Sequence, residues 1–247
     1  MPRLEIASVV HPASVPFLAD WMAGIQEIAT DETGVVVVLD GVSEQVVDPL
    51  VRQLPVRVIV ATGIGGIGKV REVLFRETLR STAEVVVFSD SDDKLLTDAL
   101  DQHIVALAED DISYGDVRLI DADGNDLSRC LFDGSVVPVR VTEWERLARR
   151  NFMGLTNTAV RPSSLSNIAH EIPQNILAVD WWYFSSLLRH GLSAKRTAAP
   201  VATYRLHEDN MVGAAPADEK NFNRQCEIML QHYATFQDEP LIEELSN

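Results

Sequence analysis

Short apolar runs alternate with longer segments of helical periodicity along the first 110 residues. Four of the runs are predicted to be strands: 6–10, 35–39, 56–60 and 85–88. Three other segments have the apolar spacing or the length typical of helices: 15–28, 70–80 and 94–108. The run 35–39 is β-branched up to its last residue, which is typical of a strand covered on both faces. The alternation predicts an α/β fold with parallel strands and intervening helices.

Length and charge limit what this fold can bind. The 247 residues, 46% of them apolar, suffice for one compact α/β domain or two small ones. The 37 acidic and 21 basic residues give a formal net charge of −16. This field repels phosphate backbones and anionic membranes, so nucleic acid is not expected as a partner. An anionic substrate would need a metal ion or well-placed arginines, because close charges outweigh distant screened ones.

Cysteine usage and hydropathy bear on the compartment. Cys130 and Cys226 form no CxxC pair, which argues against a disulfide framework or a thiolate metal site. The first apolar run stops at His11-Pro12 and is too short for a signal sequence, and no other stretch is long enough to span a membrane. The sequence therefore predicts a cytoplasmic protein without a transmembrane segment.

Polar residues follow each of the four predicted strands. They are His11-Pro12, Asp40-Gly41, Thr62-Gly63 and Ser89-Asp90. In open parallel sheets, ligands bind outside the carboxyl ends of the strands. Asp40 and Asp90 are therefore expected at one edge of the sheet, where a ligand would lie.

The last of these strand ends has the most acidic side chains, in the segment Asp90-Ser91-Asp92-Asp93. Three carboxylates within four residues repel one another, and alternate residues such as Asp90 and Asp92 can point into one cleft. A divalent cation relieves this repulsion, and Mg²⁺ or Mn²⁺ suits such oxygen ligands. The alternative is that Ser89 or Ser91, together with Asp92 and Asp93, merely caps the helix predicted over 94–108, where acids favour the helix dipole.

The ordered series of motifs resembles the family 2 glycosyltransferases. In that family a strand ends in Asp-Gly-Ser, a glycine-rich segment leads to Ala-Arg-Asn at a helix start, and a later strand is closed by DxDD. The corresponding segments here are 35–41, 66–72 and 85–93.

The second half continues the resemblance. Residues 116–124 are similar to the strand and turn that follow the DxD region, and 178–184 resemble the Glu-Asp-aromatic helix start. Residues 203–210 match a late Tyr-Arg-x-His segment. The resemblance spans roughly residues 4 to 212.

The resemblance implies a fold, an activity and a set of site residues. It implies a single Rossmann-like domain of the A-type glycosyltransferase fold, with a mostly parallel central sheet flanked by helices. The implied activity is inverting transfer of a sugar from a UDP-, GDP- or dTDP-sugar to an unknown acceptor, with Mn²⁺ or Mg²⁺. The implied division is a nucleotide-sugar-binding half (1–110), an acceptor-binding and catalytic half (111–213) and a C-terminal helical tail (214–247).

Individual residues take roles by matching these motifs. The implied catalytic base is Asp180, at hydrogen-bond reach of an acceptor hydroxyl. The implied donor nucleotide-binding residues are His11, Pro12, Asp40, Arg71 and Asp90. Asp92 and His207 are the implied metal ligands, and Asp93, Trp181 and Arg205 are candidates for diphosphate or substrate contacts.

Several of these residues have a structural alternative. Asp180 could instead be the N-cap of the helix that ends at His190-Gly191. Arg71 could pair with a donor phosphate or with Asp90, or lie on an exposed helix face. Trp181 and Trp182 cannot both face the same way on a helix, so one of the two is expected in the core.

Two other functions stay open. Val42 stands where the family has serine and Glu72 where it has asparagine, which leaves a catalytically impaired nucleotide-sugar-binding or scaffold protein conceivable. Gly63 to Val70 is close to a phosphate-binding P-loop, but Val70 lacks the hydroxyl that a P-loop offers to Mg²⁺. Nucleoside triphosphate hydrolysis through Lys69 is therefore the weaker alternative.

Two further segments are predicted to be structural. Residues 121–125 are a turn, because their glycine falls at the wrong position for a calcium loop. In the tail, one helical stripe is expected to dock on the core or to form a homodimer interface: Phe222, Cys226, Met229, Leu230, Tyr233 and Phe236.

Overall fold

The computed structural model describes residues 3–132, 137–165, 172–173, 176–207 and 219–236, which form two sheets and the helices around them. One sheet has eight strands in the order β3-β2-β1-β4-β10-β6-β11-β9. Its strands are β1 (Leu4–Val10), β2 (Thr33–Leu39), β3 (Val56–Val60), β4 (Val85–Phe88), β6 (Ile112–Tyr114), β9 (Arg140–Val141), β10 (Thr158–Val160) and β11 (Ala194–Arg196). The four-stranded sheet, in the order β5-β12-β7-β8, contains β5 (Lys94–Leu95), β7 (Val117–Ile120), β8 (Asp126–Cys130) and β12 (Ala202–Arg205).

Helices connect and cover these strands. The α-helices are α1 (Leu18–Ile28), α2 (Asp48–Val51), α3 (Ile67–Arg80), α4 (Ala99–Ala106), α5 (Trp144–Arg149), α6 (Val179–Arg189) and α7 (Glu219–Phe236). Short 3-10 helices lie at Pro12–Phe17, Glu44–Val47 and Pro162–Leu165. In the described part of the chain, no helix combines the length and the apolar character needed to cross a bilayer.

The four predicted parallel strands are confirmed. β3, β2, β1 and β4 pair in parallel, and the predicted bounds 56–60 and 85–88 agree with the structure. Val10 at the end of β1 pairs with Leu39 at the end of β2, so the segments after these strands leave from one edge of the sheet. The rest of the sheet is mixed, since β10 runs antiparallel between β4 and β6. Its strands are only two or three residues long, which is too short for a clear sequence pattern.

The helix predicted over 94–108 begins later than expected. Residues 94–95 form β5, which pairs with β12 of the second sheet, and α4 starts only at Ala99. The pairing with β12 holds the backbone after the acidic run in an extended form. The alternative in which Ser89 or Ser91 with Asp92 and Asp93 caps this helix is therefore wrong, since the N-cap of α4 is Asp98.

The helix predicted over 15–28 also begins later, at Leu18. The preceding residues form a 3-10 turn that contains Pro12 and Pro16. Proline lacks the N–H that an α-helix interior requires, so this tighter turn takes the place of the first helical turn.

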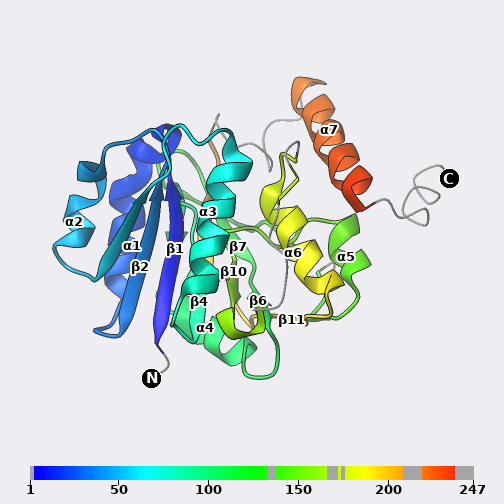
Figure 1. Cartoon of the computed structure of the whole chain (residues 1–247), viewed down its shortest axis with the longest axis horizontal. Helices are drawn as coiled ribbons and strands as arrows, with labels where there is room; N and C mark the ends of the chain where they lie inside the picture. Colours follow the sequence, from blue (N-terminus) through cyan, green and yellow to red (C-terminus); the bar gives the residue numbers. More distant parts are fainter. Residues whose placement is uncertain (1–2, 133–136, 166–171, 174–175, 208–218, 237–247) are drawn as a thin grey trace.

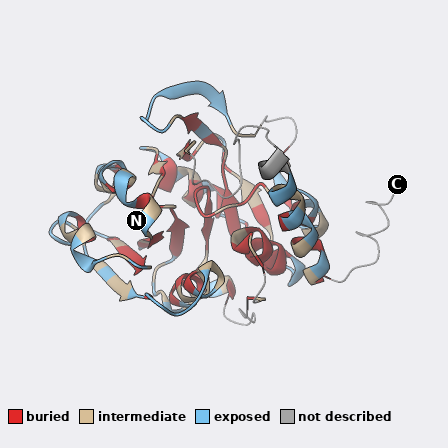
Figure 2. Cartoon of the chain, turned by 90° about the horizontal axis from the view of Figure 1, so that it is seen from above, coloured by how far each residue is buried: buried red, intermediate tan, exposed pale blue. Residues whose placement is uncertain are grey.

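Both faces of the eight-stranded sheet are buried, as the apolar strand 35–39 predicted. Val9 and Val38 join a core with residues of α3 and α6, whereas Val10 and Val37 join a second core with residues of α1 and α4. Neighbouring residues of one strand thus face opposite layers, which is the geometry of a pleated sheet. Figure 2 shows the buried strands at the centre and exposed helix faces at the rim.

The tail helix α7 lies outermost, beyond α5 and α6 (Figure 1). Its docking face is formed by Ile228, His232, Tyr233 and Phe236. Docking on the core is thus confirmed, but the predicted stripe is partly wrong, because Met229 is 38% exposed and Leu230 is 65% exposed. Cys226 is half-buried, and the side chain of Phe222 lies outside the described residues. A homodimer through α7 stays a prediction.

The turn predicted at 121–125 is present. Oδ1 of Asp121 accepts hydrogen bonds from the N–H groups of Asp123 and Asn125, at 3.0 and 2.8 Å. Gly124 has a φ of 88°, a conformation that glycine adopts without strain. This turn connects β7 to β8.

Candidate active site

A cavity of about 720 Å³ opens at the carboxyl ends of β1, β2 and β4. Its polar lining comes from both halves of the chain: His11, Asp40, Arg71, Asp90, Asp92 and Asp93 from the first, and Asn151, Thr156, Asn157, Asp180, Tyr204 and His207 from the second. Pro12 also lines it. The structure therefore brings together nine of the predicted site residues, all except Trp181 and Arg205.

The acidic run after β4 alternates between the core and the cavity. The hydroxyl of Ser91 donates 2.7 Å hydrogen bonds toward the Val9 carbonyl and the Ser14 hydroxyl, and Ser89 accepts from the indole of Trp21. Both serines are thereby held in the core, whereas Asp90 and Asp92 line the cavity. This is the alternation expected for an extended segment.

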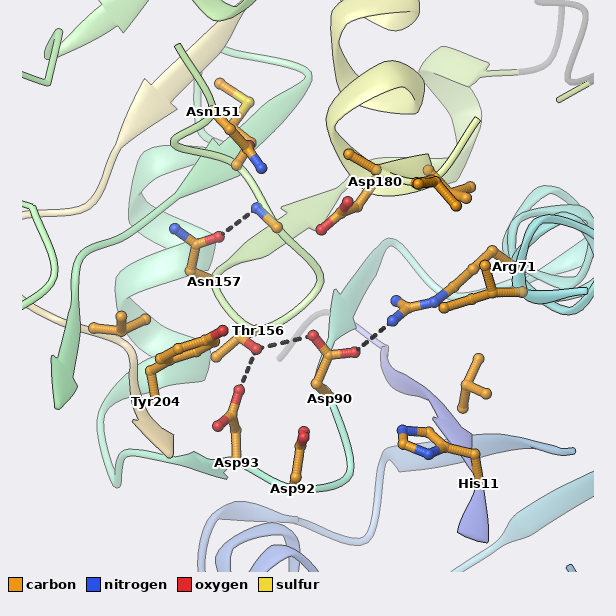
Figure 3. A pocket seen from close by; sticks show the side chains of 18 of the residues that line it. His11, Arg71, Asp90, Asp92, Asp93, Asn151, Thr156, Asn157, Asp180 and Tyr204 are labelled. Atoms are coloured by element: carbon orange, nitrogen blue, oxygen red, sulfur yellow. Dashed lines mark hydrogen bonds and ion pairs between the residues drawn. The ribbon is translucent and has the colours of Figure 1, made fainter. Parts of the chain in front are cut away.

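Asp90 is paired within the cavity. Nη2 of Arg71 lies 3.2 Å from its Oδ1, and the hydroxyl of Thr156 lies 3.0 Å from its Oδ2 (Figure 3). Burial raises the pKa of Asp90, and the Arg71 charge only partly offsets this. Of the alternatives for Arg71, pairing with Asp90 is thus the one observed. Its Nη1 is buried and has no hydrogen-bond partner among the described residues, so this nitrogen can still bind a ligand.

Asp92 and His207 meet across 115 positions of sequence, with Oδ2 of Asp92 3.0 Å from Nε2 of His207. The ring of Phe17 lies beside His207, with ring centroids 4.9 Å apart. Burial would raise the pKa of Asp92, but hydrogen bonds from His207 and the backbone reverse this and leave the pKa below its usual value. Among the described residues, no group of three or more His, Cys, Asp or Glu side chains is arranged to hold a metal ion.

Asp93 is the most deeply buried acid of the run, at 2% exposure. It accepts hydrogen bonds from the Thr156 hydroxyl and, at 2.7 Å, from the backbone N–H of Arg205. Burial, followed by the charges of Asp92 and Asp90, raises its pKa well above the usual range. Asp93 lines the cavity, but both of its hydrogen bonds tie it to the surrounding chain.

Arg205 does not line the cavity, contrary to its prediction as a substrate contact. Its guanidinium donates to the carbonyls of Asp92 and Ala122, each at 3.0 Å, and to the carboxylate of Asp20 at 2.8 Å. The side chain is 2% exposed and lies against the ring of Phe17. Arg205 therefore stabilises the acidic loop from the protein interior, through the Asp92 carbonyl.

Asp180 faces the acidic loop from the other side of the cavity (Figure 3). The N-cap of α6 is Ala178, so Asp180 lies in the first helical turn and is not the cap. Its Oδ1 accepts a 2.9 Å hydrogen bond from the N–H of Trp181. Its Oδ2 receives none from the described residues, which leaves one carboxylate oxygen available to a ligand.

Trp181 points away from the cavity and is wrong as a substrate contact. Its ring stacks on His232 of α7 at a centroid distance of 3.8 Å, and its Nε1 donates to the carbonyl of Leu147. Trp182 is also buried, at 8% exposure. Both tryptophans are thus core residues, where only one had been expected.

Sequence reasoning missed the segment 151–157, whose Asn151, Thr156 and Asn157 line the cavity. These residues follow no periodic pattern, and the only signal was a group of polar residues just before the apolar strand 158–160. It also missed Tyr204, inside a quoted motif, whose pKa is raised by burial and by the nearby acids.

The glycine-rich segment before α3 does not present its lysine to the cavity. Nζ of Lys69 lies 2.8 Å from Oε2 of Glu72, one turn along the same helix. Gly63, Gly65 and Gly66 all have positive φ. The backbone conformation of the loop therefore accounts for glycine at these positions without any role in phosphate binding. These contacts weaken the P-loop alternative.

Comparison with known proteins identifies the class of fold. The sequence matches no family model and no curated protein. The structure is similar to that of S. aureus TarS 1–349 in complex with UDP-GlcNAc, with a TM-score of 0.67 and 16% identity over 92% of this chain. It is also similar to the mannosyltransferase PcManGT from Pyrobaculum calidifontis in complex with GDP-Man and Mn²⁺, with a TM-score of 0.65 and 15% identity over 96% of this chain. The chain spans 65% of the length of each of these two structures. It therefore has the A-type fold of nucleotide-sugar glycosyltransferases, as predicted.

Proposed function

We propose that the protein is a glycosyltransferase that moves a sugar from a nucleotide-diphosphate sugar to an acceptor hydroxyl. The observation that carries this proposal is the cavity itself. The pair of Asp92 and His207 lies on one side of it, and the available Oδ2 of Asp180 lies on the other. A diphosphate would bind on the first side and a nucleophile on the second, with the sugar between them.

The donor nucleotide is assigned to the end of the cavity near His11, Pro12 and Asp40. Figure 3 shows His11 and Arg71 together at one end. Nη1 of Arg71, which has no hydrogen-bond partner among the described residues, would donate to a phosphate or a base in a protein of otherwise negative charge. The bound UDP-GlcNAc and GDP-Man of the two similar structures support a donor of this class.

Asp92 and His207 are the proposed ligands of a divalent cation. Two neighbouring ligands of an octahedral ion with bonds of about 2.1 Å lie about 3.0 Å apart. Oδ2 of Asp92 and Nε2 of His207 have this separation, 3.0 Å. These two residues would hold Mn²⁺ or Mg²⁺, with the remaining positions taken by diphosphate oxygens and water. The ion would stabilise the charge that develops on the leaving diphosphate.

Asp180 is the proposed general base. The Trp181 N–H fixes Oδ1 and so orients Oδ2, which takes the proton of the acceptor hydroxyl. Direct attack by this hydroxyl on the face of the sugar opposite the diphosphate inverts the anomeric centre. The acceptor is assigned to the side of the cavity formed by residues 151–157, in the half of the chain from 111 onward.

The test is a panel of UDP-, GDP- and dTDP-sugars scored for diphosphate release, together with calorimetry of the three nucleoside diphosphates. We expect nucleotide binding that depends on Mn²⁺ and is lost in Asp92→Asn, and turnover that falls by about 10³-fold, but stays measurable, in Asp180→Asn. Absence of metal-dependent nucleotide binding would contradict the transferase. Nucleotide binding without turnover of any donor would favour the catalytically impaired scaffold.

A further inference from the structure

Gly154 lies directly against the carboxylate of Asp180. It is half-buried and lines the cavity, and a Cβ at this position would lie 3.2 Å from Oδ2 of Asp180. Its φ is not among the positive values found at other glycines, so the backbone there accepts an L-residue without strain. The absence of a side chain at Gly154 thus matters for the space beside Asp180 and not for the path of the chain.

Asn157 holds Gly154 in this place. Its Oδ1 accepts a 2.8 Å hydrogen bond from the Gly154 N–H, and its Nδ2 donates to the carbonyls of Gly115 and Phe152 at 2.6 and 3.1 Å. Asn157 is 4% exposed, so these bonds are protected from competition with water. The position of Gly154 is therefore well defined.

The space beside Oδ2 is the space that a nucleophile needs. A hydroxyl that donates to a carboxylate brings its oxygen to about 2.5–2.7 Å. A methyl group 3.2 Å from Oδ2 would occupy part of this approach or turn the carboxylate aside. Oδ1 already accepts the Trp181 N–H, whereas Oδ2 has no hydrogen-bond donor among the described residues, so Oδ2 is the oxygen with more capacity for a nucleophile.

We propose that Gly154 is a positioning residue that keeps the approach to Asp180 open for the acceptor hydroxyl, and that Asn157 holds it there. This inference rests on the proposed function, in which Asp180 is the base. The inference adds Gly154 and Asn157 to the proposed function, as the two residues that determine how a nucleophile reaches Asp180.

The experiment is a double-mutant cycle of Gly154→Ala with Asp180→Asn, measured as diphosphate release from the donor that the panel identifies. Gly154→Ala should lower kcat at least ~10-fold, as expected for a displaced catalytic group. The KM for the donor should stay within about 2-fold, because the donor contacts lie across the cavity. In the Asp180→Asn background the same substitution should cost nothing further, since both changes act through one carboxylate.

The matched control is Gly34→Ala in β2. A Cβ at Gly34 would meet only the carbonyls of Leu4 and Pro55, at 3.9 and 4.0 Å, and wild-type turnover is expected. Folding of each variant is checked by circular dichroism. If Gly154→Ala does not fold, the cycle is repeated with Asn157→Ser, which releases Gly154 without adding an atom beside Asp180.

The outcomes separate the two proposals. Unchanged kcat, or an equal loss in both backgrounds, overturns the role of Gly154 and leaves the transferase standing. A wild-type protein that turns over no donor overturns the proposed function and this inference with it. A loss confined to the background that retains Asp180 supports both.

Discussion

The two walls of the cavity are held in place by different forces. The wall after β4 is tied by polar bonds: Arg205 holds the acidic loop through the carbonyl of Asp92, and Thr156 bridges Asp90 and Asp93. Helix α6, which carries Asp180, is held mainly by packing, in which Trp181 stacks on His232. Hydrogen bonds have direction and fix individual oxygen atoms, whereas stacking fixes a helix and leaves the Asp180 Oδ2 available.

The difference corresponds to what each wall would have to do. Three acids within four residues repel one another, and each acid of the loop has a hydrogen-bond or ion-pair partner. A base must offer an oxygen to its substrate, and a wall held by packing permits this.

Asp180→Asn should have the largest effect. Loss of a general base lowers kcat by about 10³-fold, equivalent to about 4 kcal/mol. Nucleotide affinity should be unchanged, since the nucleotide is assigned to the facing wall. Turnover and calorimetry on the same preparation check this, and a parallel loss of nucleotide affinity would contradict the separation of the two walls.

Arg205→Met should destabilise the polar wall. The substitution keeps the apolar stem but removes the donors to Asp92, Ala122 and Asp20. The free energy of unfolding should fall by about 3 kcal/mol, because hydrogen bonds from a charged donor contribute about 1.5–3 kcal/mol each. Urea unfolding measures it. Arg52→Met is the control, because the Arg52 contact with Asp48 is exposed and should contribute less than about 1 kcal/mol. Equal losses of unfolding free energy in the two variants would contradict a special role of Arg205.

His232 should make the packed wall sensitive to acid. Burial lowers its pKa from 6.5 to about 3. Below pH 6.5 the unfolded chain takes up a proton that the folded chain refuses, so stability falls until the pH approaches 3. At pH 5 this amounts to about 2 kcal/mol.

His232→Phe keeps an aromatic ring against Trp181 and should remove that part of the loss between pH 7 and pH 5. Urea unfolding at both pH values checks it. His103, whose pKa burial also lowers to about 3, retains its own contribution in this variant. An unchanged pH dependence would show that His232 is not buried in its neutral form.

Thr156→Val should have the smallest effect. It removes the hydroxyl shared by Asp90 and Asp93 but keeps the shape of the side chain. The expected cost is about 1 kcal/mol of unfolding free energy. Calorimetric unfolding beside Thr235→Val, which removes a hydroxyl bonded only within α7, is the comparison. A smaller effect for Thr156→Val than for Thr235→Val would contradict the bridging role.

Part of the site could be predicted from the sequence, and a physical reason separates the residues that were predicted from those that were not. Asp90, Asp92 and His11 were placed because a strand end has a known direction in a parallel sheet. Trp181 was misplaced because the face of a helix near its start depends on the neighbour it packs against, here α7. Thr156 was missed because its partners lie 66 and 63 residues away, and no local pattern marks such a contact.

Local sequence patterns were enough to predict the parallel strands, the edge of the sheet at which acids gather, and the residue types available there. These follow from local periodicity and backbone direction, which neighbouring residues specify. Three other features appear only in the folded chain: Arg205 contacts the acidic loop, α4 starts after β5, and Gly154 leaves Oδ2 of Asp180 accessible. Each of these depends on segments distant in sequence coming within a few ångströms, which is a property of the packed chain as a whole.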